Sequence, residues 1–480
     1  MAFRTRNAFL SPEEQALLRG RVFELLDRNG VRMDHPLVLA RLAEAGARVD
    51  FGTKQVRFPG AFLETVIAQA PRAFRLAGRD PRHDLEVPRP DGTFHTRTAT
   101  GAPFYLDPAT EQRRPVTLAD VADWARLADG LEAMDFCAFP SPGDVPPPTA
   151  DIHALRCVLE HTGKHVWVQP YRAESIEYLL RLAAVAGGGE DALGRRPIVS
   201  FITCSLTPLD FKFMDLEVMV QACPRGIPVH ACSLPAAGTT APITIPGTVL
   251  LATAEILAML AVAQTLRPGA PVVATPLIFC GDMATGSSVQ SSVEAIQGKA
   301  VAVELVRSAF GIPTHTYGWG SDGPTVDGQS AVEGALLGAL VASAGSDILG
   351  GAGQLEVAKT ISPVQLVIDE EVARVLRRIV TGLALDDDTM AWGELLAAGP
   401  GAHFLTEMHT VRHCRDPYRS RLLTRDTRPQ WETKGGLDLA TRARERYRRI
   451  VAEPTTLAVP SVEQREMDRV VRAADAALGR

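Results

Sequence analysis

The chain alternates short apolar runs with longer stretches of helical periodicity, and residues 313–356 show this pattern most clearly. Residues 314–318 are rich in β-forming side chains, and residues 319–329 form a polar loop with three glycines, one proline and two aspartates. The spacing predicts a helix of small side chains over 330–344 and a second apolar strand at 346–350. Strand, loop, helix and parallel strand make a βαβ crossover, the unit that builds doubly wound sheets and closed barrels.

The same rhythm extends over residues 118–370. Predicted strands lie near 135–139, 165–170, 197–205, 228–233, 271–279, 313–318 and 346–350, each separated by a helical stretch. We expect an eighth strand within 99–106 or around 364–368. This count predicts an α/β fold, a (β/α)8 TIM barrel. The polar or glycine-rich loops at 169–171, 204–209, 232–242, 279–288 and 317–329 are then expected to surround one cavity at the barrel mouth.

The two ends of the chain predict accessory structure. Ser11 and Glu14 form a capping box that starts a helix ending near Arg28. Two short helices are expected at 35–45 and 59–70, with a hairpin between them. We therefore divide the chain into an N-terminal accessory α+β region (1–117), the barrel core (118–370) and a C-terminal helical extension packed on the barrel (371–480).

Composition narrows the class of protein. Hydrophobic residues make up 46% and charged residues 22%, which suits a folded globular chain, and the net charge of −6 argues against nucleic acid as a partner. Seven cysteines without CxxC spacing indicate reduced, buried thiols, and the N-terminus lacks the apolar segment of a signal peptide. Residues 248–266 are strongly apolar but contain Glu255 and Gln264, which favours a buried helix over a membrane span. The cysteines also favour the cytoplasm, and we expect a homo-oligomer because the predicted outer helices carry few charges.

Several short motifs, each present once, follow one another in a specific order along nearly the whole chain. They are PVTLAD at 115–120, TGKH at 162–165, the loop with Ser321, Asp322, Asp327 and Gln329, GAGQLE at 351–356, QLVID at 365–369, HFL at 403–405 and His409-Thr410. In this order and spacing, the chain resembles the trimethylamine:corrinoid methyltransferase family, which includes glycine betaine enzymes that lack pyrrolysine. The resemblance implies a barrel that moves a methyl group from a methylated amine to the Co(I) form of a corrinoid (cobalamin) carried by a separate protein.

One departure from the family concerns the substrate. Archaeal trimethylamine enzymes of this family carry an in-frame pyrrolysine, whereas this chain has only the standard twenty residues. A quaternary ammonium leaves as a neutral tertiary amine after attack, while a tertiary amine first needs electrophilic activation. The sequence therefore favours a quaternary amine such as a betaine; the alternatives are a trimethylamine methyltransferase and a non-catalytic amine-binding homologue.

A quaternary ammonium cannot donate N–H hydrogen bonds, so its site is expected to use aromatic faces and carboxylates. The candidates at predicted strand ends are Tyr105, Tyr171, Phe279, Tyr317 and Trp319 with Asp282, while Lys164, His165, His230 and Thr239 could meet a substrate carboxylate. Each also has a structural interpretation, because aromatic residues and strand histidines mostly pack in cores.

Asp322 and Glu356 are the candidate catalytic carboxylates, although Asp322 could also cap a turn. Gly351 and Gly353 either approach the corrinoid or make a tight strand-to-helix turn. No metal site is expected, since Cys204, His230, Cys232 and Cys280 lack ligand spacing. An aldolase or lyase is disfavoured because no lysine lies within a predicted strand.

Overall fold

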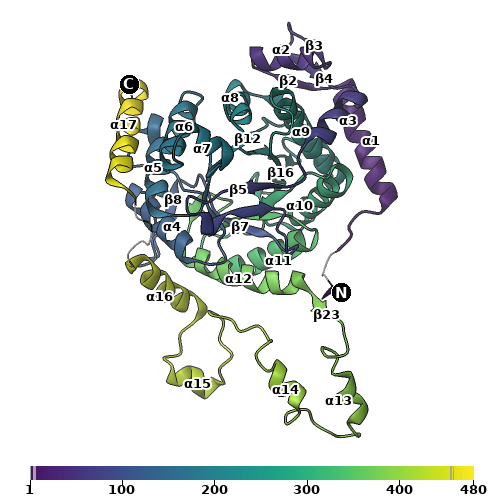
Figure 1. The fold of residues 1–480 in the computed structure, drawn as a ribbon, viewed down its shortest axis with the longest axis vertical. Helices are drawn as coiled ribbons and strands as arrows, with labels where there is room; N and C mark the ends of the chain where they lie inside the picture. Colours follow the sequence, from purple (N-terminus) through teal and green to yellow (C-terminus); the bar gives the residue numbers. More distant parts are fainter. Residues whose placement is uncertain (1, 4–6, 454–456, 458, 480) are drawn as a thin grey trace.

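The computed structural model describes residues 2–3, 7–453, 457 and 459–479, and its centre is a closed barrel of parallel strands (Figure 1). Around the barrel the strands are β7 (His95–Thr98), β10 (Phe136–Cys137), β11 (His165–Val168), β12 (Val199–Cys204), β14 (Val229–Ser233), β16 (Val272–Pro276), β19 (His315–Tyr317) and β20 (Ile348–Ala352). The barrel closes between β16 and β19, where Thr314 pairs with Ala274 and the Ala274 N–H donates to Pro313 O at 2.9 Å.

One helix follows each barrel strand and covers the outside of the sheet. In order these are α4 (Leu118–Gly130), α5 (Ala150–His161), α6 (Ser175–Ala186), α8 (Phe213–Ala222), α9 (Ile245–Leu266), α10 (Val293–Leu305), α11 (Gly328–Ser343) and α12 (Pro363–Thr381), with α7 (Glu190–Arg195) as a short addition after α6. The fold is therefore the (β/α)8 barrel expected from the sequence. Because all strands are parallel, the loops after them lie at one end, the mouth.

The eighth strand differs from both sequence-based expectations. It is β7, whereas residues 364–368 belong to α12 and residues 104–106 form β8 (Phe104–Leu106), which pairs outside the barrel with β9 (Arg113–Pro115) and β22 (Thr360–Ile361). The four residues of β7 are His-Thr-Arg-Thr, and all are buried. Hydropathy does not reveal a strand whose buried side chains are polar. Because β7 is the first strand of the barrel, the barrel begins inside the region 1–117, which the sequence assigned to the accessory region.

The N-terminal region forms the expected small elements. The capping box of Ser11 and Glu14 starts α1 (Pro12–Arg28), and α2 (Pro36–Glu44) and α3 (Gly60–Gln69) flank a hairpin of β3 (Arg48–Asp50) and β4 (Gln55–Arg57), with β2 (Val31–Met33) beside it. Helices α1, α2 and α3 pack on α9. By length and composition α9 is the one helix of the described part that could cross a membrane, but 78% of its apolar window is buried inside the protein.

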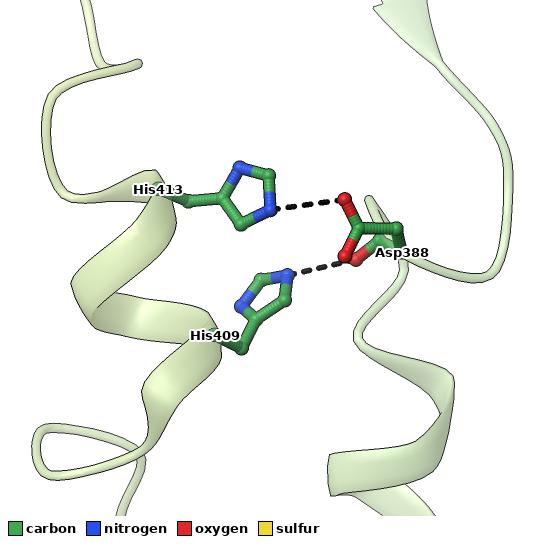
Figure 2. Close-up of side chains that lie close together, drawn as sticks. All are labelled: Asp388, His409 and His413. Atoms are coloured by element: carbon green, nitrogen blue, oxygen red, sulfur yellow. Dashed lines mark hydrogen bonds and ion pairs between the residues drawn. The ribbon is translucent and has the colours of Figure 1, made fainter.

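The C-terminal region has two parts of different character. Helix α16 (Leu439–Ala452) packs on α12 and α4, and α17 (Ser461–Leu478) packs on α5 and α6. Between α12 and α16, residues 383–438 form a segment that we call the C-terminal excursion. It contains β23 (Leu383–Ala384), α13 (Trp392–Ala397), α14 (Met408–His413) and α15 (Arg428–Thr433), and Figure 1 shows it extending away from the barrel. Within it, α14 faces the turn at Asp388 (Figure 2).

Buried polar groups close the end of the barrel opposite the mouth, which we call the base. A hairpin of β5 (Phe74–Leu76) and β6 (Leu85–Val87) lies there, and Ala77 N–H donates to Pro197 O at 3.0 Å. Lys164 donates to Ala128 O, Leu131 O and Met134 O at 2.6, 2.9 and 2.6 Å. These three carbonyls use all its donors, so Lys164 has none left for a substrate carboxylate, contrary to our expectation.

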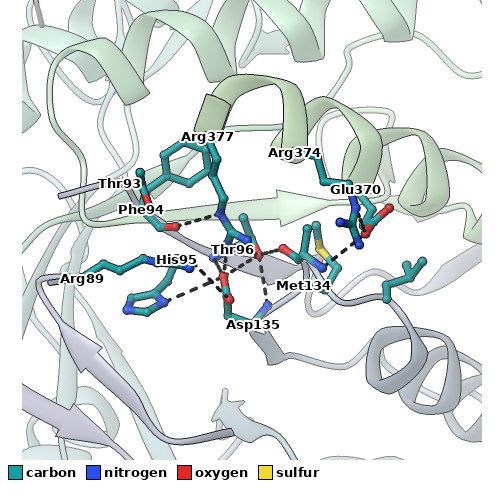
Figure 3. A network of polar contacts seen from close by, with 12 residues as sticks. Arg89, Thr93, Phe94, His95, Thr96, Met134, Asp135, Glu370, Arg374 and Arg377 are labelled. Carbon is teal, nitrogen blue, oxygen red and sulfur yellow. Dashed lines mark hydrogen bonds and ion pairs between the residues drawn. The ribbon is translucent and has the colours of Figure 1, made fainter. Parts of the chain in front are cut away.

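Asp135 joins β7, β10 and α12 at the base (Figure 3). Its Oδ2 accepts from Thr96 N at 2.7 Å and Thr96 Oγ1 at 2.9 Å and forms an ion pair with Arg377 of α12. In the same region Glu370 of α12 accepts from Arg374 Nε at 2.6 Å and Arg446 Nη1 at 2.9 Å, so it links α12 to α16. Burial tends to raise the pKa of Asp135, but Arg377 and the neighbouring donors hold it below its usual value.

We expect Asp135→Asn to lower the free energy of unfolding by about 3–5 kcal/mol, because the largely buried guanidinium of Arg377 then has no charged partner. Urea unfolding followed by circular dichroism measures this loss. Asp123→Asn is the matched control: Asp123 pairs with Arg126 on the half-exposed face of α4, and its loss should cost about 0.5 kcal/mol or less. Equal effects of the two substitutions would contradict this assignment.

Candidate active site

Four large polar or aromatic side chains meet at the centre of the barrel: Arg97, Trp167, His230 and His315. They come from β7, β11, β14 and β19, which are alternate strands of the barrel. The Arg97 guanidinium carbon lies 4.2 Å from the Trp167 ring centroid, the rings of Trp167 and His230 are 6.0 Å apart, and those of His230 and His315 are 5.3 Å apart. Side chains from non-neighbouring strands touch only inside a barrel, so these four form one interior layer.

The hydrogen bonds of this layer determine which nitrogen of each histidine carries the proton. Arg97 Nε, which can only donate, lies 3.4 Å from His315 Nε2. His315 Nε2 is therefore the acceptor, and burial together with the Arg97 charge lowers the pKa of His315, so the neutral ring carries its proton on Nδ1. That Nδ1–H and the Trp167 Nε1–H are both buried without a partner. The layer thus contains two unused donors.

His230 has the opposite tautomer. His165 Nδ1 donates to Ala77 O at 2.9 Å, so its Nε2 accepts from Ser200 Oγ at 2.9 Å. Ser200 has one hydroxyl proton, and it therefore accepts from His230 Nε2 at 3.1 Å. His230 Nδ1 is left as an unpartnered acceptor. His165 thus orients His230 from the base and does not reach a substrate.

Arg97 brings a positive charge into the layer without a compensating carboxylate. Its side chain is 1% exposed, and besides His315 it donates to Thr98 O at 2.7 Å. Burial lowers the pKa of Arg97 to about 10, so the guanidinium is still charged at neutral pH. Among the described residues Arg97 forms no ion pair. An uncompensated buried cation next to two free N–H donors is an electrostatic environment for an anion.

Aromatic side chains lie one step closer to the mouth. Tyr317 is two residues beyond His315 on β19 and so faces the same side of the strand. Its ring makes an edge contact with Phe279 of β17 (Phe279–Gly281) at 6.4 Å between centroids. Lys299 Nζ lies 5.6 Å from the Phe279 centroid and donates to Gln290 O at 2.5 Å. Burial lowers the pKa of Lys299 to about 7, which reduces the positive charge beside these rings.

Glu255 ties the mouth loop that follows β12 to the end of β14. This fully buried residue of α9 accepts from Ser205 Oγ and Ser233 Oγ at 2.5 Å each, and from Thr207 Oγ1 at 2.9 Å. Its Oε1 accepts from Leu209 N at 2.7 Å. One carboxylate therefore holds the loop after β12 against the last residue of β14, next to the strands that carry His230 and Ser200.

Asp322 holds the loops after β16 and β19 together. Its carboxylate accepts from Gln290 N at 2.9 Å and Ser291 N at 3.1 Å, and burial raises its pKa. Glu356 lies in the neighbouring turn between β21 (Gln354–Leu355) and β22, where it forms an ion pair with Arg113 at 3.1 Å and accepts from Thr360. Neither carboxylate contacts the interior layer, so their catalytic roles remain predictions.

The remaining sequence candidates are dispersed. Tyr105 packs under Arg114 and lies 3.4 Å from Tyr447 of α16, outside the barrel. Tyr171 is in the loop after β11 and donates its N–H to Asp151 at 2.9 Å.

Two polar candidates lie in surface turns. Asp282 caps the turn before β18 (Ser288–Val289) by accepting from Ala284 N and Thr285 Oγ1. Thr239 is exposed, and its hydroxyl donates to Ala236 O at 3.2 Å.

Trp319 and the two candidate glycines face protein rather than an open site. Trp319 is fully buried with its ring 6.5 Å from that of Phe94, so it does not form one cage with Tyr317. Gly351 and Gly353 have φ of +89° and +85°, and an added Cβ would lie 2.8 Å from Trp319 O and 2.5 Å from the Trp124 ring, respectively. The two glycines thus allow close packing of the backbone at the end of β20, and their contact with a corrinoid stays a prediction.

Cys204 and Cys232 are direct neighbours on β12 and β14. Burial raises the pKa of Cys232, which keeps its thiol protonated. All seven cysteines of the chain are free.

Arg97, Trp167, His315 and Glu255 were not among the sequence candidates for the site. Glu255 gave a usable signal, since it is the one carboxylate in the 22 residues of an otherwise apolar helix. Arg97 and His315 gave none beyond a charged or polar residue in a short β-like run. Their meeting depends on strand order, because β20 alone separates β7 from β19 although the two residues are 218 positions apart in sequence.

Comparisons with known proteins agree with this architecture. The profile of the trimethylamine methyltransferase (MTTB) family matches residues 3–478. A trimethylamine methyltransferase of Desulfitobacterium hafniense (strain DSM 10664 / DCB-2) is 31% identical over 439 residues, covering 91% of this chain and 88% of the relative. A glycine betaine methyltransferase of Desulfitobacterium hafniense (strain Y51) is 28% identical over 447 residues, covering 92% of each. The monomethylamine methyltransferase of Methanosarcina barkeri shares the fold, with a TM-score of 0.54, 12% identity and coverage of 96% of this chain and 91% of that one.

Lys299 makes the stability of the mouth depend on pH. Its folded pKa of about 7 lies below the ordinary 10.5, so between these values the unfolded state binds more protons and Lys299 makes stability rise with pH. We expect the unfolding free energy of the wild type, minus that of Lys299→Met, to increase from pH 7 to pH 9. Chemical denaturation at both pH values measures it. The control Lys434→Met removes an exposed lysine, and its difference should stay constant.

Proposed function

Because the chain belongs to the trimethylamine methyltransferase family, we propose that it is a corrinoid-dependent methyltransferase whose substrate is a betaine, a quaternary amine that carries a carboxylate. The methyl acceptor is Co(I) of a corrinoid carried by a partner protein. The free thiols of all seven cysteines support a cytoplasmic enzyme.

The uncompensated charge of Arg97 is the observation that carries the choice of substrate. Trimethylammonium and other amines without an anionic group would bring a second positive charge toward this guanidinium. A betaine instead offers a carboxylate, which can accept from Arg97, from Trp167 Nε1–H and from His315 Nδ1–H. His230 Nδ1 is the remaining acceptor of the layer and suits a substrate hydroxyl or a water.

This orientation directs the methyl groups toward the mouth. With the carboxylate held at the interior layer, the ammonium lies at the level of Tyr317 and Phe279, whose rings stabilise a cation through their π faces. Transfer breaks one N–CH3 bond, the electron pair stays on nitrogen, and the product leaves as a neutral tertiary amine without needing a proton. The corrinoid supplies the nucleophile at the mouth, and the protein binds, orients and desolvates the amine.

We also propose that the enzyme is a homo-oligomer. The C-terminal excursion exposes many large apolar side chains: Leu383, Leu385, Met390, Trp392, Leu395, Leu396, Phe404, Leu405, Met408 and Val411. Such a concentration on one exposed segment supports contact with another subunit. Light scattering on the purified chain at several concentrations tests this; a monomer throughout would contradict it.

We expect the enzyme to demethylate betaines and to leave trimethylamine unchanged. Purified protein is mixed with free cob(I)alamin and, separately, glycine betaine, carnitine, choline or trimethylamine, and methylcobalamin formation is followed by absorbance. Choline is the informative control, because it is quaternary but has no carboxylate. Turnover of choline or trimethylamine as fast as any betaine would disprove the role of Arg97, and betaine binding without any transfer would indicate a non-catalytic homologue.

The substitution Arg97→Met tests whether Arg97 serves substrate binding and not the stability of the fold. Loss of the carboxylate's charged partner should lower kcat/KM for the betaine at least about 100-fold, as expected for a buried charge-assisted hydrogen bond of about 3 kcal/mol. The free energy of unfolding should stay constant or rise, because the substitution removes a buried, uncompensated charge. A large loss of stability would show instead that Arg97 serves the fold.

A further inference from the structure

The C-terminal excursion has almost no apolar interior to hold its shape. Of residues 383–438, all of which are described, only Leu422 is buried. Its helices α13, α14 and α15 have six residues each, too few to be stable by themselves. Chain segments of this size without a core usually depend on a disulfide, a metal or a partner. Cys414, the excursion's cysteine, is free and exposed.

Two histidines and an aspartate converge within this segment (Figure 2). His409 and His413 are four residues apart on α14, so they lie on the same face, and their ring centroids are 4.3 Å apart. Both Nε2 atoms point to Asp388 in the turn before α13: His409 Nε2 lies 2.7 Å from Asp388 O, and His413 Nε2 lies 3.2 Å from Asp388 Oδ2. The possible ligand atoms of the three residues all lie within 4.8 Å of one another.

We propose that Asp388, His409 and His413 bind a divalent transition-metal ion, with Zn²⁺ as the preferred ion, and that this ion stabilises the C-terminal excursion. In a tetrahedral zinc site with bonds of about 2.0–2.1 Å, ligand atoms stand about 3.3 Å apart, close to the spacing of His413 Nε2 and Asp388 Oδ2. Imidazole and carboxylate are ligands that zinc accepts, and water completes the fourth position.

The surroundings support metal binding in two ways. The Nδ1 of His413 lies 2.6 Å from Asp416 Oδ2, the outer carboxylate that typically orients a metal-bound histidine. The His413 Nε2 is shielded from solvent and lacks a well-formed hydrogen bond. Arg412 Nη2 lies 3.3 Å from the other oxygen of Asp388, Oδ1, so Arg412 and His413 contact different oxygens of this carboxylate.

Metal analysis of the full-length chain tests this proposal. The chain is stripped with EDTA, desalted, incubated with ZnCl2 and desalted again, and zinc is measured by elemental analysis. We expect close to one zinc per chain in the wild type and at least a tenfold reduction in the double variant His409→Asn/His413→Asn. His403→Asn is the matched control, because it removes an exposed histidine of the same segment and should retain zinc.

Two further readouts are independent of enzyme activity. Asp416→Asn should weaken zinc affinity about tenfold in isothermal titration, as outer-shell substitutions do. Zinc should slow proteolysis within residues 383–438 in the wild type but not in the double variant. Equal zinc content in the wild type and the double variant, an absence of zinc from both, or the same loss in His403→Asn would overturn the proposal.

Discussion

Closure of the eight-stranded parallel sheet is the constraint on which the rest of this structure depends. The pairing of Thr314 with Ala274 joins β19 to β16 and leaves the barrel without an edge. Once closed, the barrel forces side chains of alternate strands into shared layers. His230 of β14 and His315 of β19 meet across this junction, whereas Arg97 of β7 reaches His315 across β20.

The two ends of the barrel use buried polar groups for different purposes. At the base, Asp135, Lys164 and His165 satisfy backbone and side-chain partners fully, so they fix the strands and the hairpin that closes this end. At the centre, donors and a charge remain unused. A buried polar group without a partner costs free energy, and a protein retains it where a ligand supplies the missing contact. Unused buried donors beside an uncompensated charge support the proposal that the interior layer binds a ligand.

The position of the Arg97 charge also determines the orientation of the proposed substrate. A cation placed deep in the barrel and aromatic rings placed toward the mouth suit the proposed zwitterionic substrate, with its carboxylate at the interior layer. In the proposed betaine complex, the reacting methyl group faces the open end, where the partner's corrinoid can approach. Glu255 and Asp322 support this arrangement indirectly: Glu255 joins the loop after β12 to the end of β14, and Asp322 joins the loops after β16 and β19. The excursion, by contrast, lies outside this framework, and its stability is assigned to the proposed metal ion at Asp388, His409 and His413.

The sequence by itself determined the elements with strong local signals. The capping box at Ser11, the hairpin at β3 and β4, seven strands and the βαβ unit around Tyr317 all follow from periodicity and turn chemistry, which act over a few residues. The tertiary structure alone decided the eighth strand and the composition of the interior layer. Strand β7 is buried but polar, so hydropathy could not identify it, and the partners of Arg97 lie on other strands. It also separated Tyr317 from Trp319, which are two residues apart, because the chain turns after β19 and sends one ring toward the mouth and the other into the packed core. Local pattern specifies which segments form strands and helices, whereas the site consists of contacts that exist only after the barrel has closed.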